Sequence, residues 1–334
     1  MYLITGGAGY IGSHMAYKLL DSGFDVLIFD NLETGHAEII EKMKTAYNNL
    51  VFIKGDLRNK DDIDKVFQNH KIDAVAHFAA YALVGESVQN PKKYWINNVV
   101  GSLNLLNSMV ENNVDKIVFS STCATYGEPK YIPIDEKHPQ NPINPYGQTK
   151  LAVEKIMDDY DKAYNLRSVR LRYFNVAGAD KLARTGEWHD METHLIPNII
   201  KSVITKGKPL EIYGNDYDTK DGTCVRDYID MEDLIDAHIK ALNYLESGGR
   251  TNFFNLGTNE GSSVTDVCLQ TKEVTGKEIK YKIMQRREGD PSALIGDNKK
   301  IKEVLGWTPK HTLKESIQNA YNWELKRISE FKLN

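Results

Sequence analysis

Tyr146 and Lys150 form a Tyr-x-x-x-Lys pair at the start of a segment with helical periodicity, Gly147–Tyr164. Helical geometry places the two side chains one turn apart on the same face. A free tyrosine has a pKa of about 10 and is a weak base at neutral pH. A neighbouring ammonium group favours the phenolate, which makes the phenol usable in general acid–base catalysis. The pair therefore predicts a proton-transfer site with Tyr146 as the base and Lys150 as its activator.

A hydroxyl-rich segment, Phe119–Gly127, leaves the end of an apolar run at Lys116–Ser120. Hydroxyls at the carboxyl end of a strand face the ligand crevice of an open α/β sheet. Thr122 is placed to hydrogen-bond a reacting substrate oxygen and to relay its proton to Tyr146. The other interpretation, a turn whose hydroxyls satisfy their own backbone, stays open for some of these residues.

Gly6, Gly9 and Gly12 follow the first apolar run and open the first helical segment with the spacing G-x-x-G-x-x-G. The first glycine permits a tight turn, the second lets the backbone approach a pyrophosphate, and the third allows close helix–strand packing. The helix N-terminus offers free N–H groups and a positive dipole end to phosphates. Asp30 ends the second apolar run about 20 residues later, where a carboxylate binds the adenosine ribose and repels a 2′-phosphate. The pattern predicts NAD as the cofactor.

These residues need a sheet that brings the ends of several strands to one edge. Apolar runs alternate with amphipathic segments through the first half of the chain, which predicts βαβ units and a doubly wound parallel sheet of the Rossmann type. The expected strands are Tyr2–Thr5, Asp25–Asp30, Val51–Lys54, Ala74–Phe78, Lys116–Ser120 and Arg167–Arg172. The expected helices are Ile11–Leu20, Lys60–Gln68, Tyr94–Glu111 and Gly147–Tyr164.

The pattern loosens after about Asn175, which predicts a smaller C-terminal α+β domain for the substrate. We expect a cofactor domain at residues 1–175 and a substrate domain at 176–334. The boundary leaves open whether parts of 229–257 return to the main sheet. The expected strands there are Leu210–Tyr213, Asn252–Leu256 and Ile279–Ile283. The expected helices are Leu195–Lys206, Met231–Leu245, Val264–Val274, Ile301–Leu305 and Leu313–Lys326.

Composition excludes several classes of protein. The net charge of −4 over 334 residues gives no bulk attraction for nucleic acid or an anionic membrane. No apolar run is long enough to span a bilayer, and no signal peptide is visible. The scattered Cys123, Cys224 and Cys268 fit a reducing compartment and give no metal site. We therefore expect a cytoplasmic protein without a metal.

Taken together, the motifs resemble the UDP-glucose (UDP-galactose) 4-epimerase family within the extended short-chain dehydrogenase/reductase superfamily. The resemblance covers nearly the whole chain. It is carried by Gly6–His14, His77–Ala80, Val84–Val88, Asn144–Gly147, Arg172–Gly178, Tyr213–Tyr217, Asp221–Ile229 and Arg286–Asp290.

The resemblance implies inversion at C4 of a UDP-hexose through a transient 4-keto sugar, with NAD regenerated and a homodimer as the assembly. Catalysis falls to Tyr146, Lys150 and Thr122. Cofactor contacts are implied for Gly6, Gly9, Tyr10, Ile11, Gly12, Asp30, Asn31, Asp56, Leu57, Phe78, Ala79, Ala80, Asn97, Ser120, Tyr146, Lys150 and Tyr173. Substrate contacts are implied for Thr122, Tyr146, Asn175, His194, Leu195, Tyr213, Arg226, Arg287, Asp290 and Leu294. Guanidinium groups at Arg226 and Arg287 suit a diphosphate in an acidic protein.

Three positions bear on specificity. Many family members have Lys where this chain has Ala82 and Asn where it has His194. Leu294 occupies the family's gate position beside the sugar, where a bulky Tyr accompanies restriction to plain hexoses. The smaller Leu294 therefore predicts that UDP-GlcNAc and UDP-GalNAc are also accepted.

The alternative is another nucleotide-sugar enzyme of the same fold, a 4,6-dehydratase or a UDP-uronate epimerase or decarboxylase. A dehydratase needs an extra acid/base pair beside the catalytic hydroxyl. Here Thr122 is followed by Cys123 and Ala124, which cannot supply one. This favours the epimerase.

Overall fold

The computed structural model describes residues 1–205, 209–287 and 290–331. The chain forms two compact units. The N-terminal unit comprises Met1–Glu128, Pro139–Arg172 and Ile235–Phe254, and the C-terminal unit comprises Pro129–His138, Tyr173–Leu234 and Asn255–Asn334. Residues 235–254 join the first unit, within the range 229–257 that the sequence allowed to return to the main sheet, whereas the transfer of residues 129–138 to the second unit was not expected.

A seven-stranded sheet is the framework of the N-terminal unit, with the strand order β11-β6-β5-β4-β1-β2-β3. The pairs of β1 with β2 and β4, of β2 with β3, and of β4 with β5 are all parallel. The predicted Rossmann-type fold is confirmed. The strands are β1 (Tyr2–Thr5), β2 (Val26–Asp30), β3 (Leu50–Lys54), β4 (Ala74–His77), β5 (Lys116–Thr122), β6 (Arg167–Tyr173) and β11 (Asn252–Leu256).

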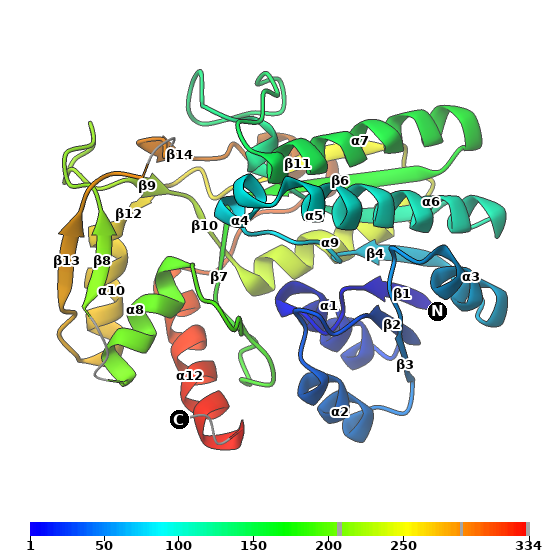
Figure 1. Cartoon of the computed structure of the whole chain (residues 1–334), viewed down its shortest axis with the longest axis horizontal. Helices are drawn as coiled ribbons and strands as arrows, with labels where there is room; N and C mark the ends of the chain where they lie inside the picture. The colour runs from blue at the N-terminus through cyan, green and yellow to red at the C-terminus, as the bar shows by residue number, and fades with distance from the viewer. Residues whose placement is uncertain (206–208, 288–289, 332–334) are drawn as a thin grey trace. The chain divides into compact units, whose positions relative to one another are not determined.

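Helices flank this sheet (Figure 1). A core cluster joins α3, α6 and α7 to one face, with Leu3, Leu105, Met109 and Met157 among its buried side chains. The segment expected as one helix at 94–111 contains a π-helical stretch, Trp95–Val100, between α5 and α6. The helices are α1 (Tyr10–Asp21), α2 (Ala37–Ala46), α3 (Lys60–Asn69), α4 (Val84–Gln89), α5 (Pro91–Tyr94), α6 (Gly101–Glu111), α7 (Pro145–Tyr164) and α9 (Met231–Glu246).

The strand order reverses at β1, which lies between β2 and β4. Chain connections run outward from β1 to β2 and β3 on one side, and from β4 to β5 and β6 on the other. Such a reversal opens a crevice at the carboxyl ends of the two central strands, and ligands of open α/β sheets bind there. The sequence motifs that follow β1, β2, β3, β4 and β5 therefore share one edge of the sheet.

The C-terminal unit has small sheets and a core in which α8, α10 and α12 meet, with Ile199, Val267 and Ile317 fully buried. Its sheets are β7 with β10, β8 with β13, and β9 between β12 and β14. The predicted end of the first helix at Lys206 lies outside the described residues. The elements are β7 (Asn175–Ala177), α8 (Leu195–Ile204), β8 (Leu210–Tyr213), β9 (Val225–Arg226), β10 (Tyr228–Asp230), β12 (Ser262–Ser263), α10 (Val264–Thr275), β13 (Tyr281–Met284), β14 (Ala293–Leu294), α11 (Lys299–Leu305) and α12 (Leu313–Phe331).

Across the described part of the chain, none of the helices combines the length and the apolar character that a membrane crossing requires.

Candidate active site

The protein's own packing explains two of the three glycines in the turn after β1. Gly6 has φ +73°, and a Cβ there would lie 2.6 Å from the backbone nitrogen of Ala79, just beyond β4. A Cβ at Gly12 would lie 2.2 Å from the carbonyl oxygen of Gly6. A side chain at either position would push the turn away from its neighbours, as the sequence analysis expected for the tight turn and for the close packing.

Gly9 is different, because nothing in the protein requires a glycine there. Its φ of −86° suits any residue, and a Cβ would meet only the Gly6 carbonyl, at an ordinary 3.4 Å. The residue sits at the N-terminus of α1, where backbone N–H groups are presented. An unexplained bare backbone at this point is a cradle that a Cβ would fill, which fits the predicted approach of a pyrophosphate.

Asp30 fixes this turn from the end of β2. Its carboxylate accepts hydrogen bonds from the backbone N–H groups of Ala8, at 2.9 Å, and of Leu32, at 2.8 Å. Burial raises the pKa of Asp30, although these two hydrogen bonds oppose the rise. Asn31 donates to Asp56 at 3.1 Å. The structure therefore brings the predicted ribose-binding carboxylate and the polar ends of β2 and β3 together.

The remaining predicted cofactor residues are spread along the same edge. Tyr10 and Ile11 begin α1, and Ala79 faces Gly6. Phe78 stacks near His238, with 4.9 Å between ring centroids. The Leu57 side chain is buried in the core, so only its backbone is left to meet a ligand. Ala80 and Asn97 are half-buried, and Tyr173 ends β6 as the first residue of the C-terminal unit's central segment.

Lys150 lies one turn after Tyr146 on α7 and is almost fully buried. Its Nζ donates to the Ser120 carbonyl at 2.7 Å, near the end of β5. Burial lowers the pKa of Lys150 to about 7, while the charge of Glu154 works in the opposite direction. The predicted activator is thus tied to the strand that carries the predicted hydroxyl relay.

Tyr146 is also buried and packs with Tyr81, Tyr94 and Ala124. Thr122 ends β5 and is 6% exposed, and its Oγ1 accepts a hydrogen bond from the Ala124 N–H at 3.1 Å. Because that hydroxyl oxygen acts as an acceptor here, its hydrogen is left to be donated. Tyr146, Lys150, Ser120 and Thr122 therefore belong to one α7–β5 arrangement in the N-terminal unit.

Several residues that hold the catalytic helix in place were not predicted from the sequence. Glu154, one turn after Lys150, forms a buried ion pair with Arg172 and accepts a hydrogen bond from Ser121 at 2.5 Å. Asn98 donates to the Tyr81 carbonyl at 3.0 Å and to Thr149 at 3.2 Å. These contacts hold α7 to β5 and β6 and to the segment after β4. A signal was available for Glu154, which shares a helical face with Tyr146 and Lys150.

His77, at the end of β4, has a structural role, because it links β4 to β1 and to α6. Its Nδ1 lies 2.6 Å from Thr5 Oγ1 and its Nε2 lies 2.8 Å from Ser102 Oγ. Complete burial and the nearby charge of Lys150 lower the pKa of His77 to about 3. The imidazole is therefore neutral at physiological pH.

In the C-terminal unit, the structure brings Arg226, Asp290 and Leu294 together. Arg226 forms an ion pair with Asp290 and donates to the Pro291 carbonyl at 2.9 Å. Leu294 lies opposite Arg226 in the β9–β14 pair and is half-buried. Asp227 supports this pair by accepting hydrogen bonds from the N–H groups of Thr258 and Gly296. Arg226 thus has a partner among the other predicted substrate residues.

The other predicted substrate residues lie on nearby elements of the same unit. The Arg287 guanidinium stands 3.9 Å from the centroid of the Tyr213 ring. Asn175 begins β7 and donates its N–H to the Asp227 carbonyl at 3.0 Å. His194 precedes Leu195, the first residue of α8, but its side chain does not cap the helix. Its imidazole instead hydrogen-bonds Glu187.

The parallel sheet, the glycine turn, Asp30 and the Tyr-x-x-x-Lys pair beside β5 define a protein of the short-chain dehydrogenase/reductase class. The profile of the GDP-mannose 4,6 dehydratase family matches residues 3–320. A UDP-glucose 4-epimerase of Lactobacillus helveticus is 49% identical over 322 residues, which cover 96% of each chain.

Solved structures agree. The UDP-glucose 4-epimerase from Brucella ovis in complex with NAD is 42% identical, with a TM-score of 0.91 over 96% of this chain and 97% of that one. The UDP-Glc/GlcNAc 4-epimerase from Campylobacter jejuni is 41% identical, with a TM-score of 0.85 over 97% of this chain and 99% of that one. The chain belongs to the UDP-glucose 4-epimerase family of extended short-chain dehydrogenases/reductases.

Proposed function

We propose that the protein is an NAD-dependent UDP-hexose 4-epimerase that interconverts UDP-glucose and UDP-galactose. The observation that carries the proposal is the buried α7–β5 arrangement of Tyr146, Lys150 and Thr122 in a chain of this family. The bare backbone at Gly9 and the carboxylate of Asp30 fit NAD. When bound, NAD supplies an acceptor for the hydrogen removed from C4 and a donor for its return.

The chain's own residues handle the proton. Tyr146 takes the proton of the sugar 4-hydroxyl, directly or through the Thr122 hydroxyl, and later returns it. The ammonium of Lys150 favours the phenolate form of Tyr146, and its bond to the Ser120 carbonyl keeps Nζ in place. Because the pKa of Lys150 is lowered to about 7, part of its charge depends on what binds beside it.

We propose that the C-terminal unit holds the UDP moiety. Arg226 and Arg287 supply guanidinium groups for the diphosphate, and the ring of Tyr213 stacks on Arg287. Asn175, His194, Leu195 and Asp290 complete the proposed substrate residues. The pair of Arg226 with Asp290 keeps the guanidinium oriented before substrate arrives.

The alternative chemistry of a 4,6-dehydratase is not favoured. That reaction also removes the C5 proton and expels the C6 hydroxyl, which needs acid/base side chains next to the catalytic hydroxyl. In this chain the turn after Thr122 is formed by Cys123, Ala124 and Thr125, none of which carries a carboxylate. The side chains beside Thr122 therefore suit transfer of one proton at the 4-hydroxyl, and supply no second acid/base pair for C5 and C6.

A cofactor-free assay tests the proposal. Purified protein should convert UDP-galactose to UDP-glucose with no added nucleotide, and NAD should appear in the supernatant after denaturation. A clean apo-protein that forms no product even with NAD added would refute the epimerase. Formation of a 4-keto-6-deoxy sugar would establish the dehydratase instead.

Tyr146→Phe should lower kcat by about 10²–10⁴-fold, the usual contribution of a general acid–base group. UDP binding should persist, because the residues proposed to hold it lie elsewhere. Tyr164→Phe is the matched control, since this residue ends the same helix and is 57% exposed. A variant at Tyr146 that keeps more than about a third of the wild-type kcat would remove this residue from the mechanism.

We further propose that the 2-acetamido sugars are substrates. The argument rests on Leu294, a half-buried residue opposite Arg226, and on the likeness to an enzyme described as acting on both UDP-Glc and UDP-GlcNAc. A leucine leaves more room than a tyrosine and has no hydroxyl to desolvate. The kcat/KM for UDP-GlcNAc should lie within about two decades of that for UDP-glucose, the range that an apolar pocket can discriminate.

Leu294→Tyr should remove the acetamido activity selectively and keep the hexose activity. Leu294→Met, which conserves volume, should keep both. Equal losses on both sugars in the tyrosine variant would make Leu294 a packing residue and end the gate argument.

The assembly and the compartment also belong to this proposal. We propose a cytoplasmic homodimer. Exposed apolar side chains at Trp95, Ile96 and Val100 support a subunit contact along the helical segment between residues 91 and 111.

A further inference from the structure

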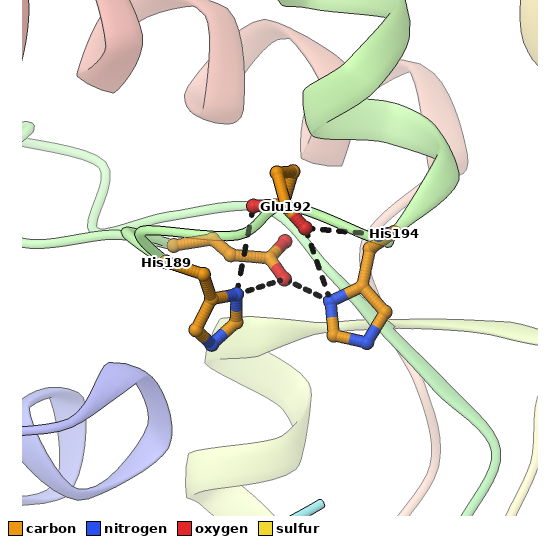
Figure 2. Close-up of side chains that lie close together, drawn as sticks. His189, Glu192 and His194 are labelled. Atoms are coloured by element: carbon orange, nitrogen blue, oxygen red, sulfur yellow. Dashed lines mark hydrogen bonds and ion pairs between the residues drawn. The ribbon is translucent and has the colours of Figure 1, made fainter. Parts of the chain in front are cut away.

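Four side chains that can ligate a metal converge in the segment that leads into α8. Glu187, His189, Glu192 and His194 each offer one ligand atom, and these atoms all lie within 4.8 Å of one another. Figure 2 shows His189, Glu192 and His194 pointing toward one another. All four belong to the C-terminal unit. None has a part in the proposed proton transfer, and His194 alone of the four is also among the proposed substrate residues.

The spacing of these atoms suits a tetrahedral metal better than hydrogen bonding. His189 Nδ1 lies 3.4 Å from Glu187 Oε1 and 3.5 Å from Glu192 Oε2. Charge-assisted hydrogen bonds measure about 2.7–2.9 Å. Metal bonds of about 2.0–2.1 Å in a tetrahedron separate neighbouring ligands by about 3.3–3.4 Å. Only the hydrogen bond between His194 and Glu187 is shorter and would have to lengthen.

Two of the converging atoms are buried without a hydrogen bond. They are His189 Nδ1 and Glu192 Oε2. The Glu192 side chain is only 4% exposed. Its other oxygen, Oε1, accepts the backbone N–H groups of Thr193 and His194 at 2.9 Å, which fixes the carboxylate and turns Oε2 toward His189. A buried carboxylate oxygen that accepts no hydrogen bond is costly, and its nearest partner, His189 Nδ1, stands 3.5 Å away, so this atom is suited to bind a cation.

The backbone around the cluster is anchored. Trp323, buried on α12, donates its Nε1–H to the Glu187 carbonyl at 3.0 Å. Asn198 of α8 donates to the Glu192 carbonyl at 3.3 Å. The backbone at Glu187 and Glu192 is therefore held by contacts that do not depend on a metal, which favours a preorganised site.

A second group, Asp230, Asp233 and His311, shows what a satisfied cluster looks like. Asp233 accepts the N–H groups of Lys310 and His311 at 2.9 Å, and its other oxygen lies 3.0 Å from His311 Nδ1. Asp230 accepts the Ser316 hydroxyl at 2.6 Å. Its carboxylates have ordinary donors, so this group supplies a control rather than a site.

We propose that Glu187 Oε1, His189 Nδ1, Glu192 Oε2 and His194 Nδ1 bind one divalent transition-metal ion, with Zn²⁺ as the best match. Two imidazoles and two carboxylates in tetrahedral array suit zinc, whereas Ca²⁺ and Mg²⁺ need six or more oxygen ligands. With all four positions filled by the protein, the site is structural. It orders residues 187–194 immediately before Leu195. The inference is independent of the proposed reaction.

Metal binding to the full-length protein tests this. Protein stripped with EDTA should bind one equivalent of Zn²⁺ in competition with a chromophoric chelator, and Zn²⁺ should raise its Tm. His189→Gln and Glu192→Gln should each weaken binding by at least about 100-fold, since even outer-shell changes cost 10–100-fold. His311→Gln should leave the affinity unchanged.

Cobalt provides a second measurement that does not depend on the variants folding. One equivalent of Co²⁺ added to the wild-type protein should give the intense visible absorption of a tetrahedral ion, and Zn²⁺ should bleach it. A weak octahedral spectrum, or Zn²⁺ binding that survives both His189→Gln and Glu192→Gln, would overturn the proposal. The cluster would then be two imidazolium–carboxylate pairs.

Discussion

The ion pair of Glu154 with Arg172 should be a main source of stability for the catalytic helix. Both side chains are 3% exposed, and the guanidinium makes a two-point contact, with Nε 2.9 Å from Glu154 Oε1 and a second nitrogen on Oε2. Glu154→Gln keeps the shape but leaves the Arg172 charge buried without compensation. Breaking a buried pair in this way costs about 3–5 kcal/mol.

The expected loss can be measured by thermal unfolding. At about 2.1 cal/mol/K per residue, the 334 residues give an unfolding entropy of about 0.7 kcal/mol/K. A loss of 3–5 kcal/mol then lowers Tm by about 4–7 °C. Asp159→Asn is the matched control, because Asp159 lies on the same helix and pairs with Lys162 at 3.5 Å, with the two side chains 79% and 76% exposed. That variant should lose less than about 1 kcal/mol.

A double variant separates lost attraction from uncompensated charge. Glu154→Leu with Arg172→Met removes both buried charges, and such replacements are often neutral. It should recover most of the stability that Glu154→Gln loses. If Glu154→Gln and Asp159→Asn shift Tm equally, or if the double variant is the least stable of the three, the buried pair is not what holds α7 in place.

Two further predictions concern the cofactor turn and Lys150. In the apo form, Gly9→Ala should keep the wild-type Tm, whereas Gly12→Ala should lower it because its Cβ would lie 2.2 Å from the Gly6 carbonyl. Gly9→Ala should also weaken NAD retention. Equal Tm losses of the two apo variants, measured by calorimetry, would remove Gly9 from the cradle. Burial lowers the pKa of Lys150 from its ordinary value of 10.5 to about 7. Between these two pH values the unfolded state holds a proton on this lysine that the folded state has released. Stability from this group therefore rises with pH in that window. The Tm of the apo-protein, relative to Lys150→Met, should increase from pH 7 to pH 9, and a constant difference would contradict the buried lysine.

The cofactor half of the site was accessible from sequence because its signals are local. The glycine turn and Asp30 follow strands whose apolar runs are unambiguous, and β1 and β8 have the predicted bounds. The interruption of the expected 94–111 helix was not visible, because a π-helical stretch of six residues is too short to give a periodicity of its own. The return of β11 to the edge of the main sheet also depends on tertiary pairing, which periodicity alone leaves open.

Supporting contacts were inaccessible because each joins residues far apart in the chain. Glu154 has the spacing of an ordinary charge on an amphipathic helix, and only Arg172, 18 residues away, makes it a core residue. The Asn98 side chain donates a hydrogen bond to the backbone carbonyl of Tyr81, 17 residues away. The cluster at 187–194 lies in a segment without regular periodicity, so its convergence appears only once Trp323 anchors the backbone.

One face of α7 connects stability to chemistry. Tyr146, Lys150 and Glu154 are spaced four residues apart and so share that face. Glu154 is fixed by Ser121 and Arg172, and Lys150 by the Ser120 carbonyl, so two successive turns are attached to β5 and β6. The first turn of α7 presents Tyr146, whose phenol has to meet a substrate oxygen at hydrogen-bond distance. Because a misplacement of 1 Å can cost about 100-fold in rate, the buried charges of the later turns are the means by which the fold positions the phenol.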